Sequence, residues 1–306
     1  MKKERKVVII TGASSGFGYN AAIMLAQKEY KVYALARRLE LMEELKKYDI
    51  TPICLDVTND ENCKKVVNDI IAKEGRIDIL INNAGYGALG PVENVSIDDA
   101  KRQMDVNVYA VARLSKEVIP QMRNQHSGRI INVTSVAGLF ALYYGGWYSA
   151  SKYALEGLSD AMRLELKKFG IRVIKIEPAA FASNWGIIAK KSLEQYADES
   201  PYEDISVVAK LYEATFTKKG FIAKDPIIAS KKIVKASIKK HPKTRYKFGR
   251  FSTSRLLMKY LLPTKLTDFF TTRLYSGKTA KKMIIKYEKK KNENKWNKNW
   301  FNNHYT

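Results

Sequence analysis

The sequence predicts an α/β fold, a doubly wound parallel sheet that forms a single domain with a basic C-terminal extension. Short apolar runs rich in β-branched residues alternate along the chain with longer helical stretches, as expected of βαβ units. Neither an internal repeat nor a linker rich in Pro, Gly and Ser divides the 306 residues. One domain therefore accounts for most of the chain.

The first expected strand covers residues 6–10 and leads through a glycine-rich turn, residues 11–18, into a helix. A chain that bends sharply under a pyrophosphate tolerates no side chain at the turn, and the free N–H groups of the helix start then face the phosphates. An ordinary glycine-containing turn is the alternative, which the position between strand and helix disfavours. The residues assigned to this contact are Gly12, Ser14, Ser15, Gly16, Phe17 and Gly18.

A second expected strand, residues 31–36, ends in Arg37 and Arg38. A dinucleotide fold that prefers NAD usually places an acidic residue here, which holds the ribose 2′-hydroxyl. Two guanidinium groups suit a 2′-phosphate instead, because arginine offers a planar fork of donors and stays charged. The sequence therefore predicts NADP(H) as cofactor, with a solvated arginine pair at the start of the next helix as the alternative.

A third expected strand, residues 51–55, is followed by Asp56 and Val57. Both are assigned to the adenine edge of the cofactor. Asp56 can equally cap the helix that follows, and the sequence leaves the two roles open.

Tyr148 and Lys152 stand four positions apart in a segment with helical character, so they lie on one helix face. A free tyrosine, with a pKa near ~10, exchanges protons poorly at neutral pH, but a cation beside it favours the phenolate. Such tuning suits acid/base catalysis on an alcohol or ketone. Any helix surface can carry this pair, so its meaning depends on the rest of the chain.

Together these features resemble the short-chain dehydrogenase/reductase family, whose members have a Rossmann fold, and in particular its hydroxysteroid and retinol dehydrogenase branch. The resemblance covers roughly residues 5–250. After the expected strand 77–81, the run Asn82 to Gly85 matches the family's Asn-Asn-Ala-Gly turn beside the cofactor. Asn107 matches the family's active-site asparagine, and Ser135 stands thirteen positions before Tyr148, as the family's serine does. The turn residues assigned to the cofactor are Asn83, Ala84 and Gly85.

The resemblance implies a hydride transfer between a nicotinamide and a carbonyl carbon. Tyr148 would exchange a proton with the substrate oxygen, and Ser135 would hydrogen-bond the same oxygen. Lys152 would lower the pKa of the tyrosine and reach the nicotinamide ribose, so that Tyr148 and Lys152 both count as cofactor contacts as well. Asn107 would hold a water that links Lys152 to solvent.

One departure from the family follows the expected strand 172–176. The family usually has Pro-Gly there, then a residue like phenylalanine and a threonine near the nicotinamide, whereas this chain has Pro178, Ala179, Phe181 and Ser183. Ser183 keeps a hydroxyl, and Pro178, Phe181 and Ser183 are assigned to the cofactor. Because alanine adopts a positive φ less readily than glycine, we expect the loop to follow a slightly different path.

Metal chemistry and membrane spans are not expected. The three histidines lie far apart in the sequence, and Cys54 and Cys63 show no ligand spacing, so no metal site is predicted. Few cysteines, no recognisable signal peptide and no apolar run approaching ~20 residues predict a cytoplasmic protein without a membrane span.

An expected substrate lid, residues 184–224, lies within the catalytic domain at residues 1–250 and mixes aromatic and apolar residues with charges. An aromatic pocket favours a lipophilic ketone, aldehyde or alcohol, whether steroid-like, retinoid-like, aryl or acyl. Core packing explains any one of these side chains equally well.

Positive charge is concentrated at the C-terminal end. The chain carries 54 basic and 31 acidic residues, and 22 basic against three acidic residues fall within 231–306, leaving +4 of the net +23 elsewhere. Residues 251–280 form an amphipathic segment that packs on the domain, covers the substrate entrance or lies on an anionic membrane surface. Residues 281–306 are expected to form a flexible basic tail with weak attraction to lipid or nucleic acid. No motif predicts a specific nucleic-acid partner.

The leading prediction is an NADP(H)-dependent carbonyl reductase or alcohol dehydrogenase that forms a homodimer or homotetramer. A non-catalytic NADP(H) sensor or interaction protein of the same fold is one alternative. A protein whose main role is peripheral association with a membrane is another.

Overall fold

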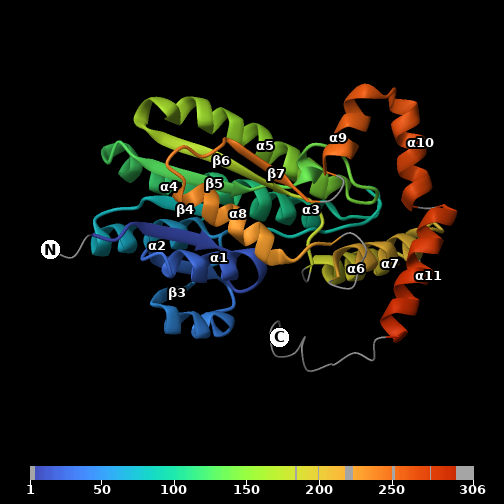
Figure 1. Cartoon of the computed structure of the whole chain (residues 1–306), viewed down its shortest axis with the longest axis horizontal. Helices are drawn as coiled ribbons and strands as arrows, with labels where there is room; N and C mark the ends of the chain where they lie inside the picture. Colours follow the sequence, from blue (N-terminus) through green and yellow to red (C-terminus); the bar gives the residue numbers. More distant parts are fainter. Residues whose placement is uncertain are drawn as a thin grey trace.

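In the part of the chain that the structure describes, seven parallel strands form one sheet in the order β3-β2-β1-β4-β5-β6-β7 (Figure 1). The computed structural model describes residues 4–182, 185–198, 200–217, 223–249, 252–275 and 277–293. The strands are β1 (Val7–Thr11), β2 (Lys31–Ala36), β3 (Ile50–Cys54), β4 (Ile79–Asn82), β5 (Gly128–Val133), β6 (Ile171–Pro178) and β7 (Arg245–Phe248). The predicted doubly wound parallel sheet is confirmed.

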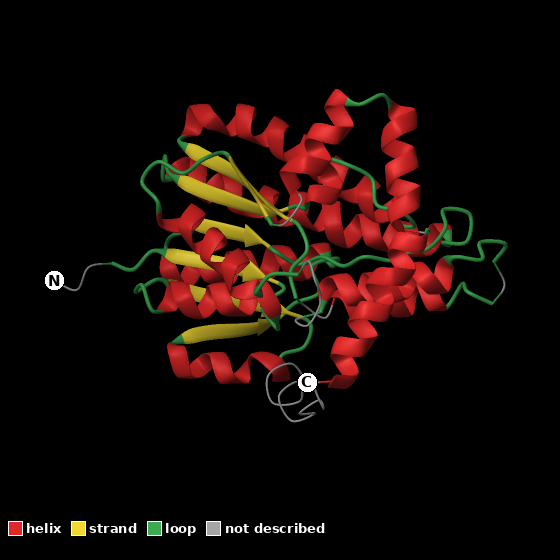
Figure 2. Cartoon of the chain, turned by 45° about the vertical axis from the view of Figure 1, so that its right-hand side comes forward, coloured by secondary structure: helices red, strands yellow, loops and turns green. Residues whose placement is uncertain are grey.

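Helices cover both faces of this sheet (Figure 2). In β1, Val8 and Ile10 pack toward one face while Val7 and Ile9 pack toward the other, which explains the continuous apolar run. The first face is covered by α1 (Gly16–Ala26), the 3₁₀ segment η1 (Glu40–Tyr48) and α8 (Pro226–Ile238). The second face is covered by α2 (Asp60–Glu74), α4 (Ala110–Asn124) and α5 (Gly146–Leu166).

Short elements connect these layers near the carboxyl ends of the strands. They are α3 (Ile97–Met104), the π-helical turn η2 (Asp105–Tyr109) and the 3₁₀ turn η3 (Val136–Gly138). A further 3₁₀ turn, η4 (Lys167–Phe169), lies at the opposite edge of the sheet, just before β6. The sheet order reverses between β1 and β4, where an open α/β sheet forms a crevice for ligands.

A third apolar cluster lies beyond this end of the sheet and joins the expected lid to the C-terminal helices. The lid contains α6 (Trp185–Glu194) and α7 (Ile205–Phe216), which pack on each other. The C-terminal part folds into α9 (Ser252–Leu261), α10 (Thr264–Tyr275) and α11 (Lys278–Glu293), at one end of the molecule (Figure 1). None of the helices in the described ranges combines the length and apolar character needed to cross a membrane.

The expected flexible tail differs from the structure over its first part, because α11 continues to Glu293. Ala280, Ile284 and Tyr287 are buried on one side of α11, and the first two pack in the third apolar cluster. Their spacing of four and three residues is typical of a helix face, but the surrounding lysines obscured it in the sequence. Residues 294–306 lie outside the described residues.

Candidate active site

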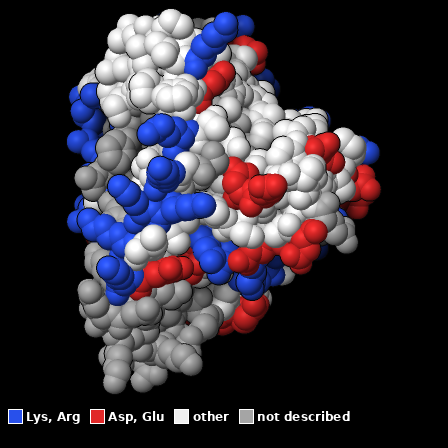
Figure 3. All heavy atoms as spheres, turned by 90° about the vertical axis from the view of Figure 1, so that its right-hand side faces the viewer, with Lys and Arg blue, Asp and Glu red and all other residues white. Residues whose placement is uncertain are grey.

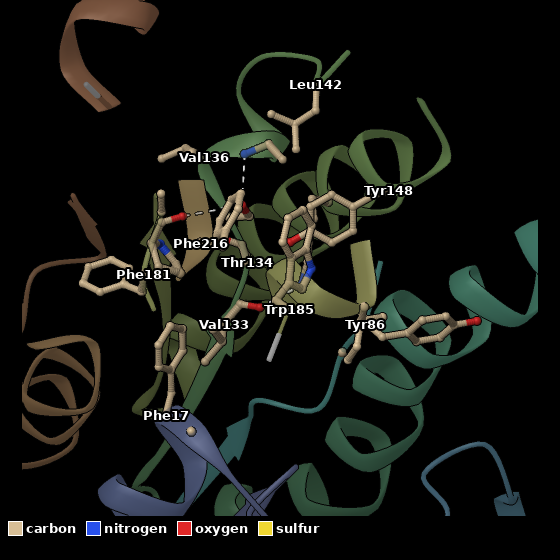
Figure 4. Close-up of a pocket in the computed structure, with 18 of the residues that line it drawn as sticks. Phe17, Tyr86, Val133, Thr134, Val136, Leu142, Tyr148, Phe181, Trp185 and Phe216 are labelled. Carbon is tan, nitrogen blue, oxygen red and sulfur yellow. Dashed lines mark hydrogen bonds between the residues drawn. The ribbon is translucent and has the colours of Figure 1, made fainter. Parts of the chain in front are cut away.

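A cavity of about 1370 Å³ opens at the carboxyl ends of the strands. It is lined by residues from the glycine turn, the end of β2, the turn after β4, α5 and the expected lid. Figure 4 labels some of them, among them Phe17, Tyr148 and Trp185. The cavity walls thus bring together chain segments that are more than two hundred residues apart.

The glycine turn fits closely against the asparagine turn. Gly12 and Gly16 have φ values of +64° and +60°, which favour glycine. A Cβ atom on Gly12 would lie 2.9 Å from Ala84 Cα, and one on Gly18 would lie 2.6 Å from Asn83 Nδ2. Side chains at either position would therefore separate the two turns.

The start of α1 is suited to an anion. Ser15 is the N-cap residue, but its side chain makes no capping hydrogen bond to the helix. The first N–H groups of the helix are therefore left for other partners, and Ser14, Ser15 and Gly16 line the cavity here.

Thr11 joins the two turns, although no role was predicted for it from the sequence. Its hydroxyl oxygen accepts hydrogen bonds from the N–H groups of Asn83 and Ala84, each at 3.0 Å. Asn83 Nδ2 in turn donates to the carbonyl oxygens of Thr11 and Gly12, at 3.0 and 3.2 Å. The only signal in the sequence was a hydroxyl at the last position of a strand before the glycine turn.

Arg37 and Arg38 are exposed side chains on the wall of the cavity, at the end of β2. The Arg38 guanidinium donates to Ser14 Oγ at 3.4 Å, which places it beside the glycine turn. Both cations can therefore reach a group that is bound at the start of α1.

Asp56 and Val57 also line the cavity, next to the arginines. Burial raises the pKa of Asp56, but two other effects outweigh it and bring the pKa below its ordinary value. Asp56 accepts hydrogen bonds from Thr58 N–H at 3.0 Å and from Thr58 Oγ1 at 2.8 Å, and the charge of Arg37 also favours the carboxylate. The suggestion that Asp56 caps α2 is wrong. Asn59 is the cap, and its side chain accepts from the Asn62 N–H at 2.8 Å.

Tyr148, Lys152 and Ser135 meet at the centre of the cavity wall. Tyr148 and Lys152 are buried on one face of α5, and Ser135 precedes η3. Ser135 hydrogen-bonds the Tyr148 side chain, and its Oγ also donates to Pro178 O at 3.5 Å. Lys152 Nζ donates to Val133 O at 3.1 Å and lies 5.8 Å from the centroid of the Tyr148 ring.

Burial is the largest cause of the pKa shifts of Tyr148 and Lys152. It raises the pKa of Tyr148 to about 12, although the hydrogen bond with Ser135 lowers it. It lowers the pKa of Lys152 to about 8, although the charge of Glu156 raises it. The Tyr148 pKa is raised and not lowered as expected from Lys152, because desolvation of the phenol dominates and the Lys152 ammonium donates to the Val133 carbonyl.

Asn107 is fully buried in the π-helical turn η2, behind the cavity wall. Its Nδ2 donates to Tyr86 O at 2.9 Å and to Ser151 Oγ at 3.0 Å, and its Oδ1 accepts from Tyr86 N–H at 3.1 Å. It thereby fixes the loop after the asparagine turn, where Gly85 lies against both Asn107 and Lys152. A π-helical turn is frequent at functional sites. The water relay assigned to Asn107 stays a prediction.

The loop after β6 does not need a glycine at position 179. Ala179 is not among the residues with positive φ, so alanine causes no backbone strain there. Its N–H donates to Phe248 O at 3.0 Å, and the backbone of Gly249, with φ of +114°, packs against it. A Cβ atom on Gly249 would lie 2.6 Å from the Ala179 Cβ, so glycine at 249 makes room for alanine at 179.

Phe181 and Phe17 close one side of the cavity, edge to face with ring centroids 5.7 Å apart (Figure 4). Pro178 also lines the cavity. Ser183, predicted to contact the cofactor, lies outside the described residues.

The other half of the cavity is aromatic and apolar. The Trp185 ring lies 5.5 Å from the Tyr148 ring and 4.4 Å from the Phe216 ring, measured between centroids (Figure 4). Helices α9, α10 and α11 also contribute, and the contribution of α11 was not expected from the sequence. The remaining large apolar or aromatic side chains of this half are Phe140, Leu142, Ile188, Leu211, Tyr212, Met258, Phe270, Leu274, Tyr275 and Met283.

Almost all of the predicted site residues that the structure describes line this one cavity. The exceptions are Gly18 and Asn107, which pack directly behind it. Across the described ranges, no three residues among His, Cys, Asp and Glu are grouped so that they could hold a metal ion.

Comparisons with known proteins point to one family. The sequence model of a family described as short chain dehydrogenase matches residues 6–192. A probable short-chain type dehydrogenase/reductase, VdlC from Helicobacter pylori, is 37% identical over 262 residues, covering 86% of this chain and 95% of that protein. The 3-ketodihydrosphingosine reductase of Bacteroides thetaiotaomicron is 38% identical over 200 residues, covering 63% of this chain and 72% of that protein.

A solved structure of similar fold is the short-chain dehydrogenase from Streptomyces avermitilis. It superimposes with a TM-score of 0.73 at 28% identity, covering 96% of this chain and all of that chain. The similarity therefore extends through the C-terminal helices, beyond the segment that the family model matches.

Proposed function

The chain belongs to the short-chain dehydrogenase family, and we propose that it is an NADP(H)-dependent oxidoreductase that interconverts a ketone or aldehyde and an alcohol on a lipophilic substrate. The observation that carries this proposal is the position of Tyr148 and Ser135 in the cavity. They lie between a half built from the glycine turn and the arginines and a half built from aromatic side chains.

The first half fits a dinucleotide phosphate. Gly12 and Gly18 leave space that a side chain would fill, and the first turn of α1 offers uncapped N–H groups to a pyrophosphate. Arg37 and Arg38, which line the cavity here, would donate hydrogen bonds to a ribose 2′-phosphate. When bound, NADP(H) supplies or accepts the hydride.

The protein's own residues handle the proton. Tyr148 stays protonated at neutral pH because burial raises its pKa to about 12, and the protonated phenol is the form that donates to a carbonyl oxygen. Ser135 donates a hydrogen bond to the same oxygen and so favours the charge that develops there. The ammonium of Lys152, buried beside the phenol, favours negative charge on the tyrosine as the proton leaves.

The second half selects a lipophilic substrate. Trp185 packs against both Tyr148 and Phe216, and side chains of α9 to α11 extend the apolar wall. The likeness to a 3-ketodihydrosphingosine reductase supports a long-chain carbonyl as one candidate. The test is NADPH oxidation in the presence of ketosteroids, retinal, aryl ketones and long-chain 3-oxo compounds, with a small polar ketone as control. No turnover of any lipophilic carbonyl, or preferred turnover of the polar ketone, would contradict the proposal.

Replacing Arg37 with aspartate should reverse the preference for NADPH over NADH. Each charge-assisted contact with the 2′-phosphate stabilises binding by about 1.5–3 kcal/mol, so NADPH affinity should fall about ten- to a hundredfold. The dissociation constants of both cofactors, measured by fluorescence titration, check this. Arg123→Asp, at an exposed position of α4, is the control and should keep the ratio of the two dissociation constants unchanged. Equal affinities for both cofactors in the unmutated protein would refute the assignment.

The kcat/KM for carbonyl reduction should fall as the pH rises through about 8. In this range Lys152, whose pKa burial lowers to about 8, loses its proton, while Tyr148 remains protonated. A neutral lysine no longer favours negative charge on the tyrosine, so kcat/KM should decline above this pH. The profile of kcat/KM from about pH 6 to about pH 10, with melting curves at each pH, measures the effect. A flat profile in the folded protein would exclude this electrostatic role of Lys152.

A further inference from the structure

Helices α9 and α10 form a hairpin with many apolar side chains. Met258 and Phe270 line the cavity. Six large apolar and aromatic side chains of the hairpin are between 45% and 72% exposed, and we call them the hairpin patch. Its members are Leu257, Tyr260, Leu261, Leu266, Phe269 and Phe270.

The hairpin stands away from the sheet, at the edge of the molecule (Figure 1). A polar contact fixes it to the domain: Lys259 Nζ donates to Leu139 O at 2.7 Å and to Tyr153 OH at 2.6 Å. That contact ties α9 to the domain. The same ammonium lies 5.6 Å from the centroid of the Tyr260 ring, yet every member of the hairpin patch is at least 45% exposed. Contiguous apolar surface of this kind marks an interaction site more often than a free surface.

The surroundings of the patch are strongly basic. Residues 252–293 contain 11 lysines and arginines and three acidic residues, a net charge of +8. Seen from this end, an uncharged area adjoins a gathering of lysine and arginine side chains, while most of the acidic side chains lie on another part of the face (Figure 3). The exposed lysines beside the patch and along α11 include Lys265, Lys278, Lys281, Lys282 and Lys289.

We propose that the hairpin patch docks on an anionic lipid surface. Exposed leucine and phenylalanine side chains enter the boundary between headgroups and acyl chains, and the lysines contact lipid phosphates, as in interfacial amphipathic helices. The charge argues against a second copy of this chain as the partner. A two-fold interface at the patch would bring together two segments 252–293, each with a net charge of +8. Phe270 belongs to both the patch and the cavity wall, so the docked hairpin would place the apolar half of the cavity next to the lipid.

Co-sedimentation with vesicles tests this docking without substrate or cofactor, so its result does not depend on the proposed activity. The full chain should bind phosphatidylcholine vesicles that contain about 30% phosphatidylglycerol. It should bind pure phosphatidylcholine vesicles much more weakly, and salt at about 0.5 M should release it from the anionic vesicles.

Two double variants separate the apolar from the charged contribution. Leu261→Ser/Phe269→Ser, at positions outside the cavity lining, should lower the partition coefficient at least about tenfold. Lys265→Glu/Lys282→Glu should lower it by about tenfold or more at low salt, since each basic residue near an anionic surface contributes about fivefold. The matched controls are Leu164→Ser on α5 and Lys64→Glu/Lys65→Glu on α2, which are exposed elsewhere and should bind like the unmutated chain.

The proposal fails if the unmutated chain ignores anionic vesicles at low salt, or if the hairpin variants and their controls bind alike. It also fails if light scattering shows a dimer that Leu261→Ser/Phe269→Ser dissociates while neither form binds vesicles, because a second copy then covers the patch. Melting curves of each variant show whether a loss of binding reflects unfolding.

Discussion

Replacing Tyr148 with phenylalanine should lower turnover at least about a hundredfold, and up to about ten-thousandfold, while NADPH affinity stays nearly unchanged. The substitution removes the hydroxyl that donates the proton but keeps the ring, which lies against Trp185 at 5.5 Å between centroids. Steady-state kinetics with an active ketone and fluorescence titration with NADPH measure the two effects separately.

Tyr48→Phe is the matched control, because it removes a hydroxyl at an exposed position outside the cavity. It should turn over like the unmutated enzyme. Lys152→Ala, in contrast, should impair both turnover and NADPH binding, since the lysine is proposed to contact the ribose as well. Turnover near the original rate in Tyr148→Phe would refute the proton-donor role, as would a binding defect in Tyr148→Phe that Lys152→Ala lacks.

The strands and the glycine turn could be predicted because their signals are local. The expected second strand agrees with β2 at both ends, and the expected third strand, residues 51–55, is shifted by one residue from β3. A buried parallel strand is a continuous apolar run, and a turn beneath a phosphate needs glycine, so both are visible in a few consecutive residues.

Elements whose stability depends on distant partners were missed. Strand β7 has only four residues, and its sequence, Arg-Tyr-Lys-Phe, shows no continuous apolar run. It exists because it pairs with β6, where Tyr246 lies opposite Ile176. Helix α11 was likewise hidden, because its buried side chains, Ile284 among them, are separated by lysines.

Side-chain chemistry was predicted only in part. The spacing of Tyr148 and Lys152 indicated their common helix face, but not the burial that sets their pKa values in opposite directions. Burial depends on how α6 packs against α5, and Trp185 on α6 is 37 positions from Tyr148 in the sequence. No local pattern could therefore show that desolvation outweighs the nearby ammonium.

A buried network of charges behind the catalytic residues was also invisible in the sequence. Lys175 on β6 is buried, and its Nζ lies 2.8 Å from both Glu156 Oε2 and Asp160 Oδ2 on α5. Arg245 on β7 contacts Glu156 at 3.0 Å and Glu177 at 2.6 Å. Because Glu156 lies one turn beyond Lys152 and two turns beyond Tyr148, these ion pairs fix the catalytic helix to the sheet.

Replacing Lys175 with methionine should therefore destabilise the fold by about 3–5 kcal/mol, because it leaves Glu156 and the fully buried Glu177 facing each other with Arg245 as their shared cation. Denaturant unfolding measures the loss, and Lys64→Met, at an exposed position of α2, should change stability by less than about 0.5 kcal/mol.

The pH dependence of that loss identifies its cause. In the unmutated protein, burial and then the charge of Glu156 raise the pKa of Glu177 to about 7, while Lys175 lowers it. Removing Lys175 should raise this pKa further. A carboxyl whose pKa is higher in the folded than in the unfolded chain loses stability as the pH rises, so the deficit of Lys175→Met should be small near pH 5 and grow toward pH 8. A deficit that is equal at both pH values would indicate lost packing and not an unpaired charge. Adding Glu156→Gln to Lys175→Met should then recover part of the lost stability at pH 8. The added substitution removes the charge of Glu156, which has lost its lysine and repels Glu177.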